Sequence, residues 1–196
     1  MSNLAKFLVQ RIARQSHKLR IRYYQYLSDC RRVEGVPVFV QPALMLGQGE
    51  MRFGKNVLLG YFPSPHYYRG YIHLEARSGT ALIEIGENTF LNNNSVILCD
   101  ETKVSIGADC LIGPNFLVMD SDFHNLNPML RRTGKPISNP VTLGRNIFVG
   151  ANVTIVRGTN IGADSVVGAG SVVSGVFPPR VVIAGNPARI VKHFDT

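Results

Sequence analysis

The sequence predicts an all-β fold, a parallel β-helix made of repeated six-residue units, with an α-helical segment in front of it. Three observations support this: an apolar period of six, glycines that follow the apolar positions, and a change of character near residue 36. The chain has 196 residues, of which 45% are apolar and 17% charged. This composition is typical of one compact domain and argues against a disordered chain.

The six-residue period is clearest between residues 141 and 175. An apolar residue stands at every sixth position there, and four of the six are followed directly by glycine. The six residues are Leu143, Val149, Ile155, Ile161, Val167 and Val173. The residues two places earlier are β-branched or small, so each unit is expected to be a short strand followed by a tight turn. Three such units would close one triangular coil, and stacked coils would bury the apolar positions in a continuous core.

Residues 1–35 form a separate basic segment. They carry eight Lys or Arg residues and two acidic residues, whereas the rest of the chain is nearly neutral. Apolar residues recur there at helical spacing, first Leu4, Leu8 and Ile12 and then Leu19, Tyr23 and Leu27. The resulting helix would either pack on the body or contact an anionic membrane surface or a partner. Because the body carries so little net charge, a nucleic-acid partner is not expected.

We divide the remainder into a repeat region, 36–183, and a tail, 184–196. Two long interruptions break the repeat, near 62–80 and 121–140. A coil accepts an insertion at a corner without disturbing the core, so these loops are where chemistry is expected. The first is rich in tyrosine, which fits either sugar contacts or a hydrophobic flap on the prism. The second contains one histidine, His124.

The run "VTLGRNIFVGANVTIVRGTNIGADSVVGAGSVVSGVFPPRVVIAGNPARIVK" resembles the hexapeptide-repeat acyltransferases, especially the galactoside, maltose and polysaccharide O-acetyltransferases. Weaker repeats extend the resemblance back to about residue 36. The resemblance implies that the β-helix is left-handed and that the protein is a homotrimer. It also implies that acetyl-coenzyme A lies in a groove between neighbouring prisms.

The resemblance also implies that His124 is catalytic. Transfer of an acetyl group from a thioester to a hydroxyl needs a base, and an imidazole that titrates near neutrality suits that task. Asp122, Asp120 or a backbone carbonyl could orient the ring, and a backbone N–H in the groove could bind the oxyanion. There is no GxSxG motif, and neither Cys99 nor Cys110 has a visible link to the histidine. Direct transfer is therefore preferred over a covalent intermediate.

The coenzyme contacts implied by the resemblance fall on five residues. Ala151 and Ala169, one 18-residue coil apart, would lie beside the pantetheine arm, where small side chains let it approach the backbone. Ser174 would be a further contact, although Gly175 follows it where the family often has lysine. Arg189 and Lys192 would meet the nucleotide phosphates, and the alternative for both is a solvated cationic tail.

The acceptor contacts implied by the resemblance are Asn93 together with Asp100 or Glu101 in "NNNSVILCDE". The function we expect is acetyl-coenzyme A-dependent O-acetylation of a sugar or polysaccharide precursor. An N-acyltransferase acting on an amino sugar and a non-catalytic trimeric scaffold are the alternatives. The five histidines lack the close spacing of a zinc site in this fold, so no metal is expected. No segment is apolar enough to be a signal peptide or membrane span, so we expect a cytoplasmic protein, with membrane contact limited to residues 1–35.

Overall fold

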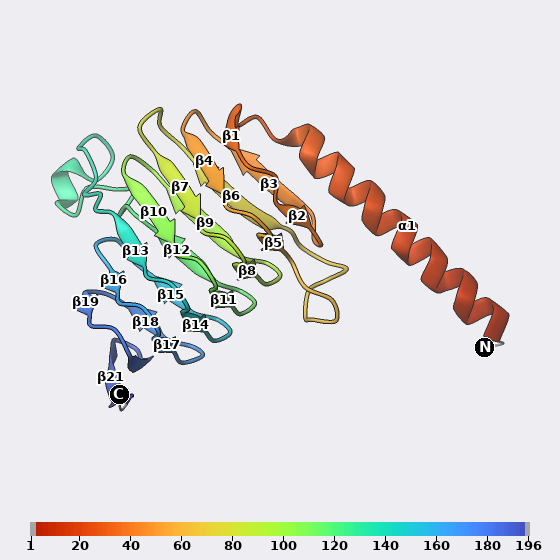
Figure 1. Ribbon diagram of the computed structural model, residues 1–196. Coiled ribbons are helices and arrows are strands. Elements are labelled where there is room, and N and C mark those ends of the chain that lie inside the picture. Colours follow the sequence, from red (N-terminus) through yellow and green to blue (C-terminus); the bar gives the residue numbers. More distant parts are fainter. Residues whose placement is uncertain (1–2, 195–196) are drawn as a thin grey trace.

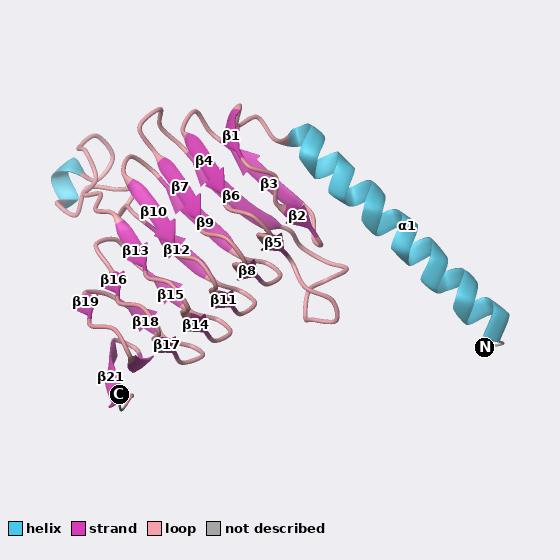
Figure 2. Ribbon diagram, viewed as in Figure 1, coloured by secondary structure: helices cyan, strands magenta, loops and turns pink. Residues whose placement is uncertain are grey.

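A computed structural model describes residues 3–194, so residues 1, 2, 195 and 196 of the expected first and last segments lie outside it. One long helix, α1 (Asn3–Leu27), leads into a stack of short strands that wind around a common axis (Figures 1 and 2). The strands form three sheets, and successive strands along the chain belong to successive sheets. The architecture is therefore a three-sided parallel β-helix.

We call the three sheets I, II and III. Sheet I contains β1 (Arg32–Glu34), β4 (Glu50–Phe53), β7 (Leu82–Ile85), β10 (Lys103–Ile106), β13 (Val141–Leu143), β16 (Asn160–Ile161) and β19 (Val176–Phe177). Sheet II contains β2 (Val38–Phe39), β5 (Leu58–Leu59), β8 (Phe90–Leu91), β11 (Leu111–Ile112), β14 (Phe148–Val149), β17 (Val166–Val167), β20 (Val181–Gly185) and β21 (Ala188–His193). Sheet III contains β3 (Ala43–Leu46), β6 (Ile72–Ala76), β9 (Val96–Cys99), β12 (Leu117–Met119), β15 (Thr154–Ile155) and β18 (Val172–Val173). All pairings are parallel except that of β20 with β21, and a short 3-10 helix, η1 (Pro128–Leu130), lies in the loop after β12.

The core lies inside the prism, where one side chain of each strand points inward. All six residues of the predicted period, from Leu143 to Val173, are at most 1% exposed, which confirms the repeat. The corners where sheet I passes into sheet II repeat an Asn or Asp in the left-handed region, among them Asn88 and Asp109, which are hydrogen-bonded side chain to side chain at 3.1 Å. A β-carbon on Gly86 would lie 2.4 Å from the backbone nitrogen of Ala108 in the next coil. Glycine is therefore required at that corner for the coils to stack.

The outer surfaces of sheets I and II differ in chemistry. Sheet I carries charged pairs between neighbouring strands, such as Arg32 with Glu50 at 2.9 Å and Lys103 with Glu84 at 2.6 Å. Sheet II carries a column of apolar side chains that are aligned strand to strand. This column consists of Val38, Leu58, Phe90, Leu111, Phe148, Val166 and Val182. Sheet I is thus suited to water, whereas the column on sheet II is suited to a partner surface.

The structure changes three boundaries expected from the sequence. The first strand begins at Arg32 rather than at residue 36. The first insertion covers 60–71 rather than 62–80, because residues 72–76 form β6 with alternate side chains buried. This strand was not expected because the loop before it breaks the six-residue count. The second insertion occupies 120–140, close to the expected 121–140.

Helix α1 presents its apolar stripe to solvent and not to the body. Leu8, Ile12 and Leu19 are 47%, 67% and 64% exposed, while His17 is the buried residue of the helix. His17 and Arg20 face the prism, where they bind backbone carbonyls of Val40 and of the 60–71 loop. Of the two alternatives for the helix, packing of this stripe on the body is not what the structure shows, because other residues of α1, among them His17, Arg20 and Tyr24, make that contact. None of the helices among residues 3–194 is both long and apolar enough to cross a bilayer.

Candidate active site

His124 stands near the start of the loop that joins β12 to β13. Its side chain is exposed and lines a surface hollow of about 390 Å³ together with Met129, Arg131 and Arg132. Within residues 3–194 the imidazole has no hydrogen-bond partner. Both ring nitrogens are therefore available to exchange a proton with a bound molecule.

The backbone just before His124 is held in an uncommon conformation. Phe123 has a φ of +56°, in the left-handed region that bulky residues rarely occupy and that costs about 1–3 kcal/mol. The guanidinium of Arg77 lies 4.9 Å from the centroid of the Phe123 ring. The surrounding contacts thus hold this turn, and the turn sets the direction in which His124 leaves the prism.

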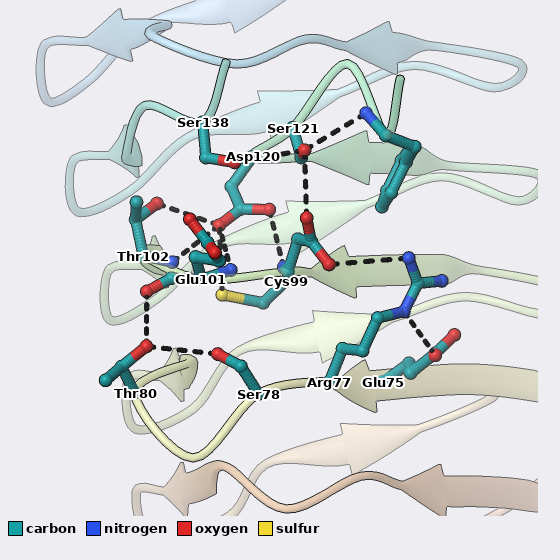
Figure 3. A network of polar contacts seen from close by, with 12 residues as sticks. Glu75, Arg77, Ser78, Thr80, Cys99, Glu101, Thr102, Asp120, Ser121 and Ser138 are labelled. Atoms are coloured by element: carbon teal, nitrogen blue, oxygen red, sulfur yellow. Dashed lines mark hydrogen bonds and ion pairs between the residues drawn. The ribbon is translucent and has the colours of Figure 1, made fainter. Parts of the chain in front are cut away.

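Ser121 ties the two ends of the loop together (Figure 3). Its hydroxyl oxygen accepts hydrogen bonds from the Ser138 hydroxyl at 3.0 Å and from the Phe123 N–H at 3.0 Å. It donates to Oδ2 of Asp100 at 3.1 Å. An antiparallel bridge between Ser121 and Ser138 closes the same point. We call these four residues the loop neck: Asp100, Ser121, Phe123 and Ser138.

Charged side chains at the end of β6, in the preceding coils of sheet III, hold the loop neck in place through Asp100 (Figure 3). Arg77 lies 3.4 Å from Oδ1 of Asp100 and donates through Nε to Glu75 at 2.9 Å. The hydrogen bond from Arg77 lowers the pKa of the Glu75 carboxyl, so that group stays ionised near neutrality. His73 lies 3.3 Å from the same carboxylate. Sequence reasoning missed these residues, because their role appears only when β6 is placed beside β9.

Asp120 is fully buried and holds the corresponding corner of the preceding coil (Figure 3). Its Oδ1 accepts from the Asp100 N–H at 2.6 Å, and its Oδ2 accepts from the N–H and the hydroxyl of Thr102, both at 2.8 Å. No hydrogen bond joins it to His124 in the described part of the chain. The suggestion that Asp120 orients the imidazole is therefore corrected: its oxygens are already engaged by the 100–102 turn.

Asp122 is also engaged elsewhere. Its Oδ1 lies 2.7 Å from Nε of Arg157, and both side chains are about three-quarters buried. Its N–H donates to the carbonyl of Ile137 across the loop. Within one chain, Asp122 thus anchors the loop to the coil below, and among the described residues no hydrogen bond or ion pair joins it to His124, so the structure does not show the orienting role expected from the sequence.

The cysteine thiols are not suited to nucleophilic attack. Burial, together with the negative charge of Asp120, raises the pKa of Cys99 to about 12, and burial raises the pKa of Cys110. The thiolate is the reactive form, and it is scarce at neutral pH when the pKa is so high. Among residues 3–194, no three His, Cys, Asp or Glu side chains gather closely enough to hold a metal ion.

The residues expected to bind the coenzyme lie at two different corners. Ala151 and Ala169 stack where sheet II passes into sheet III, so closely that a β-carbon on Gly150 would lie 2.6 Å from the nitrogen of Ala169. Arg189 pairs with Ala184 at the same corner of the last coil. Ser174 is exposed where sheet III returns to sheet I, the corner that also carries the His124 loop. The fifth residue, Lys192, pairs with Val182 on the sheet II side.

The residues expected to bind the acceptor are mostly occupied within the chain. Asn93 is fully buried, and its side chain bonds to both backbone groups of Tyr61 at 3.0 Å and to the carbonyl of Pro65 at 2.9 Å. Its expected contact with sugar hydroxyls is corrected: it holds the 60–71 loop. Asp100 belongs to the loop neck, and Glu101 pairs with Lys135 of the His124 loop at 3.1 Å.

Comparison with known proteins supports this architecture. A family model described as the hexapeptide repeat of succinyl-transferase matches residues 140–174. The structure of the hexapeptide-repeat acetyltransferase VCA0836 from Vibrio cholerae, complexed with acetyl-coenzyme A, is 38% identical. It matches 58% of this chain and 61% of its own, with a TM-score of 0.55. The predicted fold class, a left-handed parallel β-helix with an N-terminal α-helix, is thereby confirmed.

Two curated relatives extend the comparison. The galactoside O-acetyltransferase of Escherichia coli K12 is 41% identical over 113 residues, which make up 58% of this chain and 55% of that protein. The chain thus matches about half the length of this relative. WbbJ of Escherichia coli K12, which is named as a lipopolysaccharide biosynthesis O-acetyl transferase, is 33% identical over 162 residues. These make up 79% of this chain and 77% of WbbJ. On this coverage the chain belongs to the family of hexapeptide-repeat acetyltransferases.

Proposed function

We propose that this protein transfers an acetyl group from acetyl-coenzyme A to a hydroxyl of a sugar or polysaccharide precursor, with His124 as the general base. The observation that carries the proposal is the exposed imidazole of His124, free of internal partners, on a loop whose neck is braced by hydrogen bonds. The names of the relatives, which refer to galactoside and lipopolysaccharide O-acetyl transfer, favour a hydroxyl acceptor.

His124 accepts the proton of the acceptor hydroxyl while the hydroxyl oxygen attacks the thioester carbonyl. A C–O ester bond forms, the C–S bond breaks, and the proton held by His124 passes to the departing thiolate sulfur. A backbone N–H stabilises the oxyanion that develops between these events. The high pKa of Cys99 favours this direct route over an acyl-cysteine intermediate.

Ala151 and Ala169 would hold the pantetheine arm, because their small side chains leave the stacked corner open to a thin ligand. Arg189 and Lys192 on β21 are exposed cations suited to phosphate. We expect Arg189→Ala to raise the KM for acetyl-coenzyme A about tenfold with little change in kcat. Arg145→Ala removes an exposed cation at another corner and should leave KM unchanged. Equal effects of the two variants would argue against a phosphate contact at Arg189.

Two features favour a homotrimer with active sites shared between copies. The apolar column on sheet II, with Leu111 and Phe148 half exposed, is suited to burial against a second copy. The corner with Ala151 and the corner with His124 lie on opposite edges of sheet III. A neighbouring copy could therefore bring its own coenzyme corner to the imidazole.

We further propose that α1 contacts the anionic inner face of a membrane and that the protein is otherwise cytoplasmic. Described residues 3–27 include six Lys or Arg and no acid, and the apolar stripe through Leu8, Ile12 and Leu19 is exposed. The protein should co-sediment with vesicles of phosphatidylcholine and phosphatidylglycerol, and Leu19→Asp should weaken this. Equal binding to pure phosphatidylcholine would contradict the charge-based part of the proposal.

The direct test replaces His124 and measures release of free thiol from acetyl-coenzyme A. We expect His124→Ala and His124→Gln to lower kcat at least about 100-fold, with an unchanged melting temperature because the side chain is exposed and makes no internal bond. A panel of sugars and amino sugars as acceptors distinguishes O-acetylation from N-acylation. Turnover by either variant within a few fold of the unmodified protein would remove His124 from the mechanism. No thiol release with any acceptor would favour the scaffold alternative.

A further inference from the structure

A second hollow lies away from His124, between α1 and the 60–71 loop. Its volume is about 710 Å³, larger than that of the hollow beside His124. One wall is a face of the helix with Arg11, Arg14 and Lys18, and the opposite wall is aromatic. Its floor is formed by His17 and the strand that begins the second sheet. Neither the relatives' names nor the proposed acetyl transfer accounts for this hollow.

The helix wall is suited to an anion. Arg11, Arg14 and Lys18 are spaced three and four residues apart, so their side chains rise from one face of α1. None of these three forms an ion pair within residues 3–194, and no acidic residue is among the described residues that line the hollow. Three unpaired cations around one cavity would be stabilised by a phosphate or carboxylate.

The aromatic wall is suited to a flat apolar surface. The rings of Phe62 and Tyr67 have their centroids 4.8 Å apart, and those of Tyr67 and Tyr68 are 4.9 Å apart. Burial raises the pKa of the Tyr67 hydroxyl, which fits its position inside the hollow. Clustered aromatic rings bind the C–H face of a sugar ring as well as other apolar groups.

Three polar side chains fix this aromatic wall before any ligand binds. Asn93 holds the first part of the loop, as described above. The Gln41 amide donates to the carbonyls of His66 and Arg69, at 2.9 and 3.1 Å. The Arg20 guanidinium donates to the carbonyls of Tyr68 and Gly70, at 2.9 and 2.6 Å. Because these hydrogen bonds already fix the loop, little conformational entropy is lost in the aromatic wall when a ligand binds.

The floor of the hollow offers a buried acceptor with no partner. His17 is 4% exposed and stacks on Tyr67 with a centroid distance of 4.2 Å. Its Nε2 lies 2.8 Å from the Val40 carbonyl, which can only accept, so Nε2 carries the hydrogen. Nδ1 is buried and unpartnered within residues 3–194. In the neutral ring Nδ1 is an acceptor, so the complementary group is a donor such as a hydroxyl.

We propose that this hollow is a binding site for a sugar that carries an anionic group. The three cations of the helix wall bind the phosphate or carboxylate. The aromatic rings pack against the C–H face of the pyranose, and Nδ1 of His17 accepts a hydrogen bond from a sugar hydroxyl. The three recognition elements together select an anionic saccharide over a neutral sugar or a bare anion. The proposal does not depend on acetyl transfer, because the hollow lies at another corner than His124 and, although it shares the corner between sheets II and III with Ala151, it is several coils away from that residue.

The test measures binding directly by calorimetry on the full chain, with glucose 1-phosphate, glucuronate, glucose and inorganic phosphate as probes. We expect at least one of the two anionic sugars to bind about tenfold more tightly than glucose and than inorganic phosphate. Which of the two binds more tightly distinguishes a phosphate from a carboxylate ligand. Failure of both to exceed glucose and inorganic phosphate would overturn the proposal.

Two variants and a matched control locate the site. Arg14→Gln and Tyr67→Leu should each weaken the anionic sugar at least fivefold, whereas Arg22→Gln, on the same helix but outside the hollow, should not. The ¹⁵N resonance of His17 Nδ1 should shift on binding in the unmodified protein. Equal losses from Arg14→Gln and Arg22→Gln, or an unmoved Nδ1 resonance, would mean that the sugar binds only to diffuse positive charge.

Discussion

Neighbouring residues of one short segment have different roles because their surroundings differ. Asp120 is fully buried and accepts hydrogen bonds from the 100–102 turn, Asp122 is paired with Arg157, and His124 is exposed without an internal partner. Groups that are engaged within the chain hold structure, whereas a titratable group left free on the surface of a rigid loop can react. Only the last of the three is therefore a candidate for proton transfer.

Asp120→Asn should destabilise the protein by about 2–4 kcal/mol, because an amide NH₂ would replace an acceptor opposite backbone N–H donors. Asp122→Asn, which removes one charge of a pair that is about three-quarters buried, should cost less, about 1–2 kcal/mol. Urea unfolding at one fixed protein concentration measures both losses. A smaller loss for Asp120→Asn than for Asp122→Asn would contradict the structural role given to Asp120.

The burial of some residues could be predicted from the sequence, whereas that of others could not. Leu143 and its periodic partners could be placed in the core because burial there follows from local spacing. The burial of Asn93 could not be predicted, because it depends on the 60–71 loop folding back onto a coil some 30 residues further along the chain. The exposure of His124 likewise depends on contacts between distant strands that have no signal in the local pattern.

At the scale of elements, the loop neck is the link between the prism and the candidate base. The Ser121 hydroxyl accepts hydrogen bonds from both ends of the loop and donates one to Asp100. Arg77 in turn holds the Asp100 carboxylate in place. A reacting group that is displaced by about 1 Å can lose about 100-fold in rate. The neck therefore controls position rather than chemistry.

Ser121→Ala should lower kcat about tenfold and leave the KM for acetyl-coenzyme A within about twofold, because the neck holds His124 but not the coenzyme corner. Ser105→Ala, on the outer surface of sheet I, removes a hydroxyl that bonds only to Glu84 at 3.3 Å and should change neither constant. Steady-state kinetics of the two variants provide the comparison. A parallel rise of KM in Ser121→Ala would show that the neck acts more widely than the loop.

Elements differ in how far they could be predicted. The coils from β13 to β18 follow the six-residue period without interruption, and the helix follows from its 3.6-residue spacing. Strand β6 was missed because the preceding loop shifts the count, although its alternation of buried residues was present in the sequence. The side of α1 that faces the prism could not be predicted, since it depends on His17 and Arg20 meeting carbonyls far along the chain.

At the scale of the whole molecule, the three sheets give the prism unlike surfaces. Sheet I carries charged pairs on β1, β4, β7 and β10, sheet II carries an apolar column, and sheet III lies between the His124 corner and the Ala151 corner. A homotrimer would bury the apolar column and place unlike corners of adjacent copies together. Neither corner would then form a complete site within one chain.

Mixing two inactive variants tests this account most directly. His124→Ala lacks the base, and Ala151→Trp blocks the coenzyme corner, so each variant alone should be inactive while retaining its melting temperature. Co-expressed with different tags and isolated as mixed trimers, they should recover about one third of the normal activity, because one of the three interfaces in each mixed trimer pairs two intact halves. Mixed trimers that remain inactive would contradict a site shared between copies.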